Sequence, residues 1–226
     1  MCFAAVAVTI GSSLRAQSIT IQNFSFEDSV LTTDQFTDYG PANTIPDWTN
    51  PGLSGVQHMS TPSDPNPYTG AGGGYPGYDY DSIPDGVNAA FNDSTGSIAQ
   101  VLSSSLEAGD YTMTVAVGWR NGGSFSGGSF GLYTSTGTLL DSISVIQPAQ
   151  GTFQDESFTF DSAGNANLGD TLMVSLNGAG GKSADFDNVR LNFVAAVPEP
   201  STWALLGAGM LIFAGFGVAR RRSMAL

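Results

Sequence analysis

The chain has 226 residues, with 29 Gly, 11 Pro and only 12% charged residues, a composition that excludes a helical bundle and favours a β-rich protein with many turns. Between residues 17 and 197, three basic residues stand against 19 acidic ones, a net charge of −16. Such a surface excludes nucleic-acid binding as the main function and is compatible with neutral glycans and metal cations.

The N-terminus has the character of a signal peptide. Residues 2–10 are small and apolar, and "LRAQ" offers a cleavage point after Ala16, so we predict a removed signal segment over residues 1–16. No Lys or Arg precedes the apolar run, and a buried first strand stays an alternative. Cys2 is the only cysteine, so the mature body is expected to contain no disulfide.

Short alternating runs then recur along the body. In "YTMTVAVGW", residues 111, 113, 115, 117 and 119 are apolar or aromatic and share one face, the period of a half-buried strand. Turn signals such as "EAGD", "TSTGT" and "DSAGNANLGD" separate the runs. We therefore predict an all-β sandwich over residues 17–195, with strands at Ser18–Gln22, Val87–Phe91, Ile98–Leu102, Tyr111–Gly118, Phe130–Tyr133, Leu139–Ile146, Phe153–Phe160, Thr171–Leu176 and Val189–Phe193.

Residues 60–86 contain no strand-length apolar run and are rich in Gly and Pro, which predicts a long loop. The loop includes Asp79, Asp81 and Asp85, but their spacing fails the calcium-loop pattern, and Ala90 stands where the bidentate Glu belongs. We interpret this segment as a solvated acidic loop.

Aromatic residues near this loop suggest a glycan surface, because ring faces suit the C–H faces of sugars. The candidate glycan-binding residues are Tyr75, Tyr78 and Tyr80 in the loop, with Trp119 and Arg120 at the end of a predicted strand. Local packing anchors are the alternative for the tyrosines, and we expect Trp48 to belong to the core.

Catalysis has little support in the sequence. The only histidine is His58, and no G-x-S-x-G motif is present, so neither a hydrolytic triad nor a histidine-based zinc site is expected. Acidic residues are abundant, but no pair stands out as the two carboxylates of a glycosidase. We therefore expect a protein that is not an enzyme, with no catalytic residue, and keep a polysaccharide hydrolase as the weakest alternative.

The body also resembles a known class of domains. It opens with "NFSFE" (23–27), continues through "IAQVL" and "LEAGDYTMTVAVG", and closes with "DFDNVRL" (185–191). This pattern is similar to the galactose-binding-like jelly-roll domains, which include many carbohydrate-binding modules. The resemblance implies a jelly-roll β-sandwich with a structural Ca²⁺ held by Glu27 and Asp187, with Asp185 as an additional ligand. The alternative is that Asp187 only shapes the end of a strand.

The C-terminus carries a three-part pattern. Val197, Pro198, Glu199 and Pro200 precede 17 uncharged residues (203–219), and Arg220, Arg221 and Arg222 follow. The apolar stretch predicts a single transmembrane helix with the arginines on the cytoplasmic side. The order of motif, helix and arginines, over residues 196–226, resembles the PEP-CTERM sorting signal of Gram-negative bacteria. The resemblance implies processing by exosortase after transient anchoring in the inner membrane, and association with exopolysaccharide, biofilm or the extracellular matrix.

Together these features predict an exported protein of the cell envelope, retained at the surface or secreted. Its leading function is a non-enzymatic one, with binding of exopolysaccharide. A purely structural or adhesive protein without a sugar site is the alternative.

Overall fold

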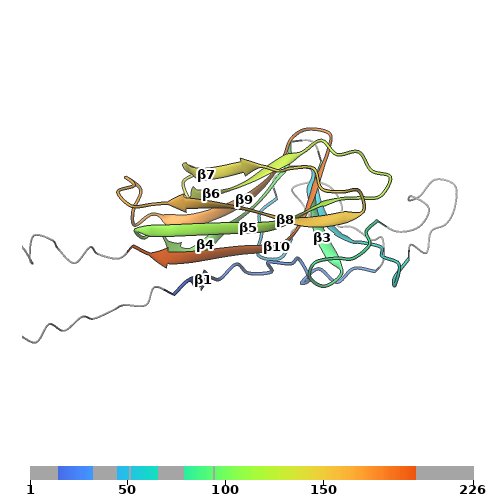
Figure 1. Cartoon of the computed structure of the whole chain (residues 1–226), viewed down its shortest axis with the longest axis horizontal. Coiled ribbons are helices and arrows are strands. Elements are labelled where there is room, and N and C mark those ends of the chain that lie inside the picture. The colour runs from blue at the N-terminus through green and yellow to red at the C-terminus, as the bar shows by residue number, and fades with distance from the viewer. Residues whose placement is uncertain (1–14, 33–44, 51, 66–78, 94, 197–226) are drawn as a thin grey trace, which may run out of the picture. The chain divides into compact units, whose positions relative to one another are not determined.

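The computed structural model describes residues 15–32, 45–50, 52–65, 79–93 and 95–196 (Figure 1). Within this part of the chain the regular structure is entirely β. The strands are β1 (Gln17–Ile19), β2 (Ser54–His58), β3 (Asn88–Asp93), β4 (Ser97–Ser105), β5 (Gly109–Trp119), β6 (Gly128–Thr134), β7 (Leu139–Ser144), β8 (Thr152–Asp161), β9 (Thr171–Gly178) and β10 (Lys182–Ala195).

The strands form two antiparallel sheets that lie in two layers (Figure 1). The larger sheet has the order β2-β3-β10-β5-β8, and β1 also pairs with β10. The smaller sheet has the order β4-β9-β6-β7. The predicted all-β sandwich is therefore confirmed, and the first and last strands are neighbours, with Gln17 opposite Phe193.

The main core fills the space between the sheets. Alternate residues of β5 point inward, and Tyr111, Met113, Val115 and Val117 are all 1% exposed or less, as the period of two predicts. Facing residues of β6 and β9 complete the core. Trp48 is buried as expected, and its Nε1 donates a hydrogen bond to the Asn23 carbonyl oxygen.

The predicted strands all correspond to observed ones, with differences at their ends, but β2 (Ser54–His58) was missed. Its sequence, SGVQH, has one strongly apolar residue, Val56. The strand forms because it pairs along its whole length with β3, a tertiary contact that local pattern does not show.

A second, smaller core lies on the other face of the larger sheet. Residues 79–86, the described end of the predicted long loop (60–86), cross this face together with Val87; we call residues 79–87 the strap. Tyr80 in the strap is fully buried with Met59 and Ala89, and Ile83 and Phe153 pack against them. The outer face of the sheet is therefore partly covered, and the side chains beneath the strap are removed from water.

The chain divides into two compact units at Ala195 and Ala196. The predicted signal segment and sorting tail fall almost wholly outside the described residues. Within the part that the structure describes, no helix is long and apolar enough to cross a membrane.

Gly118 is required for the strap to pack on the sheet. A Cβ at this position would lie 2.6 Å from the Phe153 ring and 2.7 Å from the Tyr80 hydroxyl. We therefore expect Gly118→Ala to lower the free energy of unfolding by about 1–3 kcal/mol, measured by urea denaturation. Gly123→Ala is the control, because a Cβ there meets nothing closer than 3.4 Å. Equal stabilities of the two variants would contradict the packing argument.

Candidate functional site

A strained loop after β1 positions the first predicted calcium ligand. Asn23 and Phe26 have positive φ angles of 45° and 63°, which residues other than glycine rarely adopt. Phe26 is fully buried, and its ring centroid lies 5.3 Å from that of Trp48, so packing offsets the strain. The loop thereby has a fixed conformation just before Glu27.

Backbone amides at the start of β3 hold the Glu27 carboxylate. Its Oε1 accepts hydrogen bonds from the backbone N–H groups of Val87 (2.9 Å) and Asn88 (2.7 Å). The preceding residue is Gly86, with φ of 70°, and a Cβ there would lie 2.2 Å from the Glu27 Cδ. A side chain at position 86 would therefore displace the carboxylate.

Asp187 on β10 is the second carboxylate of this region and has no exposed surface. Its two oxygens accept hydrogen bonds from the backbone N–H groups of Asp85 (3.0 Å) and Asn188 (2.6 Å). Burial, together with the negative charges of Asp85 and Glu27, raises the pKa of Asp187 to about 8, although the two hydrogen bonds act in the opposite direction. The structure therefore places Glu27 close enough to Asp187 for its charge to raise the pKa of that carboxyl.

Asn88, whose backbone N–H donates to Glu27, also holds the segment around Glu27 through its side chain. Its Nδ2 donates to the carbonyl oxygens of Phe26 (3.1 Å) and Ser29 (2.9 Å) on either side of Glu27. Its Oδ1 is buried and has no hydrogen-bond partner among the described residues, which is costly for an amide oxygen. We call Glu27, Asn88 and Asp187 the carboxylate cluster.

The carboxylate cluster has the donor chemistry of a hard-cation site, because carboxylate and amide oxygens are the ligands that Ca²⁺ prefers. The described residues contain no group of three or more His, Cys, Asp or Glu side chains placed to hold a metal ion. A cation here would therefore depend on two carboxylates, the unsatisfied Asn88 oxygen and further oxygens from the backbone or water. The cluster fits Ca²⁺ in its chemistry and leaves most of the coordination shell to such oxygens.

Asp185, the third predicted ligand, belongs to a different network. Arg120 Nε and Nη2 donate to its Oδ2 (2.7 Å) and Oδ1 (2.9 Å), and the Tyr80 hydroxyl donates to Oδ2 (2.5 Å). Arg120 also donates to the Gln57 Oε1 (2.5 Å) and lies 5.7 Å from the centre of the Phe91 ring. This arginine network neutralises the buried Asp185 with a side chain of the protein itself.

The pKa shifts in the arginine network follow from burial and this pairing. Burial raises the pKa of Tyr80 well above its ordinary value, and the charge of Asp185 raises it further. Burial lowers the pKa of Arg120, but the charge and hydrogen bonds of Asp185 outweigh it, and the net pKa is raised. Tyr80 is therefore a permanent donor and Arg120 a permanent cation.

The predicted glycan-binding residues do not form a ring platform in the described part of the chain. Tyr80 is completely buried, and Arg120 is engaged with Asp185. Trp119 is half-buried, with its Nε1 donating to the Gly123 carbonyl oxygen at 2.9 Å. Tyr75 and Tyr78 lie outside the described residues. The resemblance and composition thus indicated a glycan surface but do not locate it.

Two remaining candidates have structural roles. Asp79 is buried rather than solvated, and its Oδ2 accepts hydrogen bonds from the backbone N–H and hydroxyl of Ser60 (3.1 and 2.9 Å). His58 is 9% exposed, and its ring nitrogens lie 3.0 Å from the Leu31 carbonyl oxygen and 2.9 Å from Asp64 Oδ2. Asp79 thus links the strap to the segment after β2, and His58 links β2 to residues 31 and 64.

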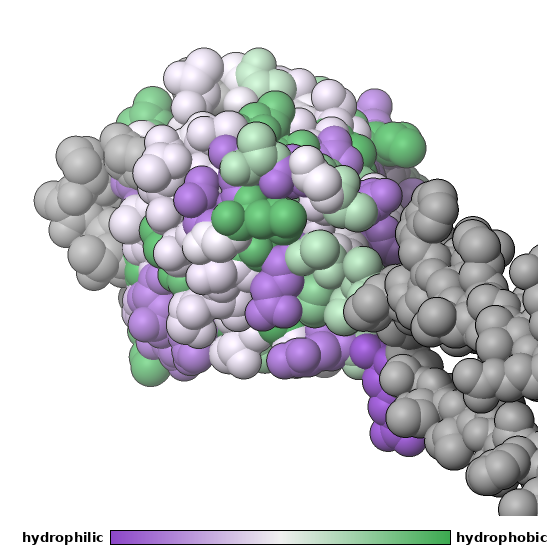
Figure 2. Space-filling model, turned by 90° about the vertical axis from the view of Figure 1, so that its left-hand side faces the viewer, coloured by the Kyte–Doolittle hydropathy of each residue, from purple (hydrophilic) through white to green (hydrophobic). Residues whose placement is uncertain are grey.

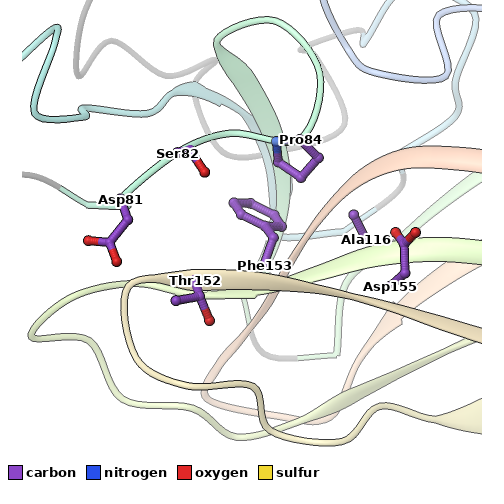
Figure 3. A pocket seen from close by; sticks show the side chains of 7 residues that line it. All are labelled: Asp81, Ser82, Pro84, Ala116, Thr152, Phe153 and Asp155. Atoms are coloured by element: carbon purple, nitrogen blue, oxygen red, sulfur yellow. The ribbon is translucent and has the colours of Figure 1, made fainter.

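A pocket that the sequence did not indicate lies between the strap and the larger sheet (Figure 3). Its volume is about 280 Å³. The strap contributes Asp81, Ser82 and Pro84, and the sheet contributes Ala116, Thr152, Phe153 and Asp155. Because these residues come from three separate segments, only the paired register of β5 and β8 and the course of the strap bring them together.

We expect Asp185→Asn to lower the free energy of unfolding by about 2–4 kcal/mol, because it leaves Arg120 with a charge that no carboxylate compensates. The Arg120 side chain is 25% exposed and that of Asp185 4%. Asp155→Asn is the control: its ion pair with Arg190 joins side chains that are 56% and 40% exposed, so the expected loss is about 0–1 kcal/mol. Urea denaturation of both variants measures the difference, and a similar loss in each would contradict this account.

Asp187 should make stability depend on pH in the absence of metal. Its pKa is about 8 in the folded state against 3.8 ordinarily, so between these values the folded chain binds a proton that the unfolded chain has lost. Stability in EDTA should therefore fall as pH rises from about 4 to about 8, by about 6 kcal/mol at most. Thermal denaturation across this range tests it. Asp187→Asn should flatten the pH dependence, and an unchanged slope would refute the assignment to Asp187.

Comparison with known proteins places the chain. Residues 17–192 match the family model described as HpiC1-like, HpiC1 cyclase. Residues 196–222 match the PEP-CTERM protein-sorting motif, which confirms the predicted sorting signal and implies export to the cell envelope with exosortase processing. A comparison with curated proteins found no match.

Solved structures share the fold. A cyclase from Fischerella sp. TAU is 23% identical, with a TM-score of 0.62 over 81% of this chain and 100% of that one. The Stig cyclase Fisc from Fischerella sp. TAU, in complex with (3Z)-3-(1-methyl-2-pyrrolidinylidene)-3H-indole, is 23% identical, with a TM-score of 0.61 over 80% and 100%. The CBM22-1 xylan-binding domain from Paenibacillus barcinonensis is 10% identical, with a TM-score of 0.41 over 74% and 100%, too low to carry an argument.

The family model covers most of the chain, from the first residue of β1 into β10. The cyclase structures align over the same sandwich at identities that establish the fold alone. This chain belongs to the HpiC1-like family and ends in a PEP-CTERM sorting motif.

Proposed function

We propose that this chain is an exported, non-enzymatic protein of the cell surface or extracellular matrix that binds exopolysaccharide through its jelly-roll sandwich. The observation that carries the proposal is the position of the sorting motif, which begins at residue 196, directly after β10 ends at Ala195. The sandwich is thereby the part of the chain left to act in the envelope once exosortase has processed the tail.

The state of the buried acids supports a non-enzymatic role. A catalytic acid or base has to reach a substrate, whereas Asp185 is 3% exposed and held by Arg120 and Tyr80. Asp187 is fully buried beneath the strap residue Asp85. Neither carboxylate lines the described pocket between the strap and the sheet.

We further propose that the carboxylate cluster binds a structural Ca²⁺. A cation there would relieve the repulsion between Glu27 and Asp187 and satisfy the buried Asn88 Oδ1. It would also join the loop after β1 to β3 and β10, so its effect would be on stability and on the position of the strap.

The test uses the exported chain and the isolated exopolysaccharide of the producing organism, immobilised on beads, in Ca²⁺ or in EDTA. We expect retention in Ca²⁺, weaker retention in EDTA, and a melting temperature several degrees lower in EDTA. Glu27→Gln should abolish the response to Ca²⁺. The matched control is Asp28→Asn, which changes an exposed neighbour outside the cluster. A folded chain that is not retained in either buffer would remove exopolysaccharide binding and leave a structural role.

Membership in a family named for a cyclase favours a second candidate, which is small-molecule cyclisation. A cyclase from Fischerella sp. TAU was solved in complex with 4-(1H-indol-3-yl)butan-2-one. Because Asp185 and Asp187 are buried and already hydrogen-bonded, the present chain is expected not to bind this indole. Saturable binding that shifts the fluorescence of its tryptophans, and that Asp185→Asn removes, would favour the cyclase candidate over the matrix protein.

A further inference from the structure

The pocket between the strap and the larger sheet has the features of a sugar subsite (Figure 3). Its volume of about 280 Å³ lies at the lower limit for ligand pockets, and is suited to one ring rather than an extended small molecule. In the close-up, the Phe153 ring stands between the strap residues Ser82 and Pro84 and the strand residue Thr152. The pocket thus offers one aromatic wall, the Ser82 hydroxyl, and a Thr152 hydroxyl that donates to the Ala149 carbonyl oxygen at 2.7 Å and can therefore only accept from a ligand.

The walls of the pocket are preformed. The Phe153 ring packs against Tyr80, with ring centroids 4.3 Å apart, over the bare backbone of Gly118. The Asp81 backbone N–H donates to the Gly151 carbonyl oxygen at 2.9 Å, which ties the strap to the turn just before β8. A ligand would therefore meet an ordered aromatic wall at little entropic cost.

The charge of the pocket is negative and only partly compensated. Two carboxylates line it, from Asp81 and Asp155, and no basic side chain does. Asp155 forms an ion pair with Arg190, whose Nη2 lies 2.6 Å from its Oδ1. Among the described residues, the Asp81 side chain has no hydrogen bond or ion pair. In a body with 19 acidic and three basic residues between positions 17 and 197, this carboxylate would repel an acidic sugar.

We propose, as a deepening of the proposed function on which it rests, that this pocket binds a hexosamine unit with a free, protonated amino group. Asp81 would pair with the ammonium group, which is a charge-assisted interaction. The Phe153 ring would lie against the C–H face of the sugar. The Ser82 hydroxyl would bind a sugar hydroxyl, and the Thr152 hydroxyl oxygen would accept a hydrogen bond from another. The polymer recognised is then an amino-sugar polysaccharide that is at least partly de-N-acetylated.

The experiment measures binding of D-glucosamine oligomers to the exported full chain by isothermal titration calorimetry. N-acetylated oligomers of the same length and oligogalacturonate are the comparison ligands. We expect the glucosamine oligomer to bind about tenfold more tightly than the acetylated one, and the uronate not to bind. Raising the salt concentration should weaken binding.

Two variants locate the site. Asp81→Asn should weaken glucosamine binding about tenfold, and because Asp81 is exposed this change leaves the fold intact. Phe153→Leu should weaken binding of both the free and the acetylated oligomers. Asp110→Asn is the matched control, since Asp110 is an exposed acid at the far end of β5, and it should bind as the wild type does.

Equal weakening by Asp81→Asn and Asp110→Asn would overturn the proposal, because it would indicate general attraction between a polycation and an acidic protein. Tighter binding of the acetylated oligomer or of the uronate would overturn it as well. If the native exopolysaccharide is retained on beads while the glucosamine oligomer does not bind, the pocket assignment fails and the proposed function stands. If neither binds, both fail.

Discussion

The central strand of the larger sheet carries two buried carboxylates, and the segments that cross this face of the sheet have to supply partners for both. Asp185 and Asp187 are two residues apart on β10 and therefore lie on the same face of the sheet. Neither has more than 3% of its surface exposed. An isolated buried carboxylate is strongly disfavoured, so each requires a partner, and the segments that cross this face supply partners of different kinds.

The two solutions differ in how complete they are. Asp185 is paired with a permanent cation, Arg120, and with a permanent hydrogen-bond donor, Tyr80. Its charge is therefore compensated within the protein. Within the described residues, Asp187 receives hydrogen bonds from backbone N–H groups alone and stands near the further negative charges of Asp85 and Glu27. The first arrangement fixes the strap on the sheet. The arrangement around Asp187 provides no compensating positive charge from the described residues, which is why the calcium proposal concerns Asp187 rather than Asp185.

Much of the fold could be predicted from the sequence because the period of two in β5 and β8 is strong and glycine-bearing turns separate the strands. The strand β2 could not be predicted, since its place depends on pairing with β3 rather than on its own residues. For the site, the opening and closing motifs indicated Glu27 and Asp187, and in the structure the charge of Glu27 acts on Asp187. They could not reveal that Asp185 is matched by Arg120, a residue 65 positions away whose contact exists only in the folded sheet.

This chain and the cyclases share the β-sandwich. A shared sandwich does not determine the function of the outer face of the larger sheet. In this chain the strap covers part of that face with Tyr80 and Ile83, and a small pocket lies beside Phe153. A difference in function within one fold can arise in this way, because sheets hold the scaffold while loops determine which side chains reach the solvent. The arginine network is the residue-level feature by which relatives can be compared with this chain.

The pairing of Gln17 with Phe193 also has a mechanical consequence. The chain enters the sandwich at the start of β1 and leaves it at the end of β10, at one and the same end, on the left in Figure 1. Figure 2 shows the molecule from this side, where hydrophilic and hydrophobic residues are interspersed. The pocket and the carboxylate cluster lie toward the beginning of β10, at the other end. A load applied between a ligand in the pocket and Ala195 would pull β10 along its own axis. Its ladder with β5, which runs from Asp185 to Ala195, would then bear the force in shear, with many hydrogen bonds loaded at once rather than one after another.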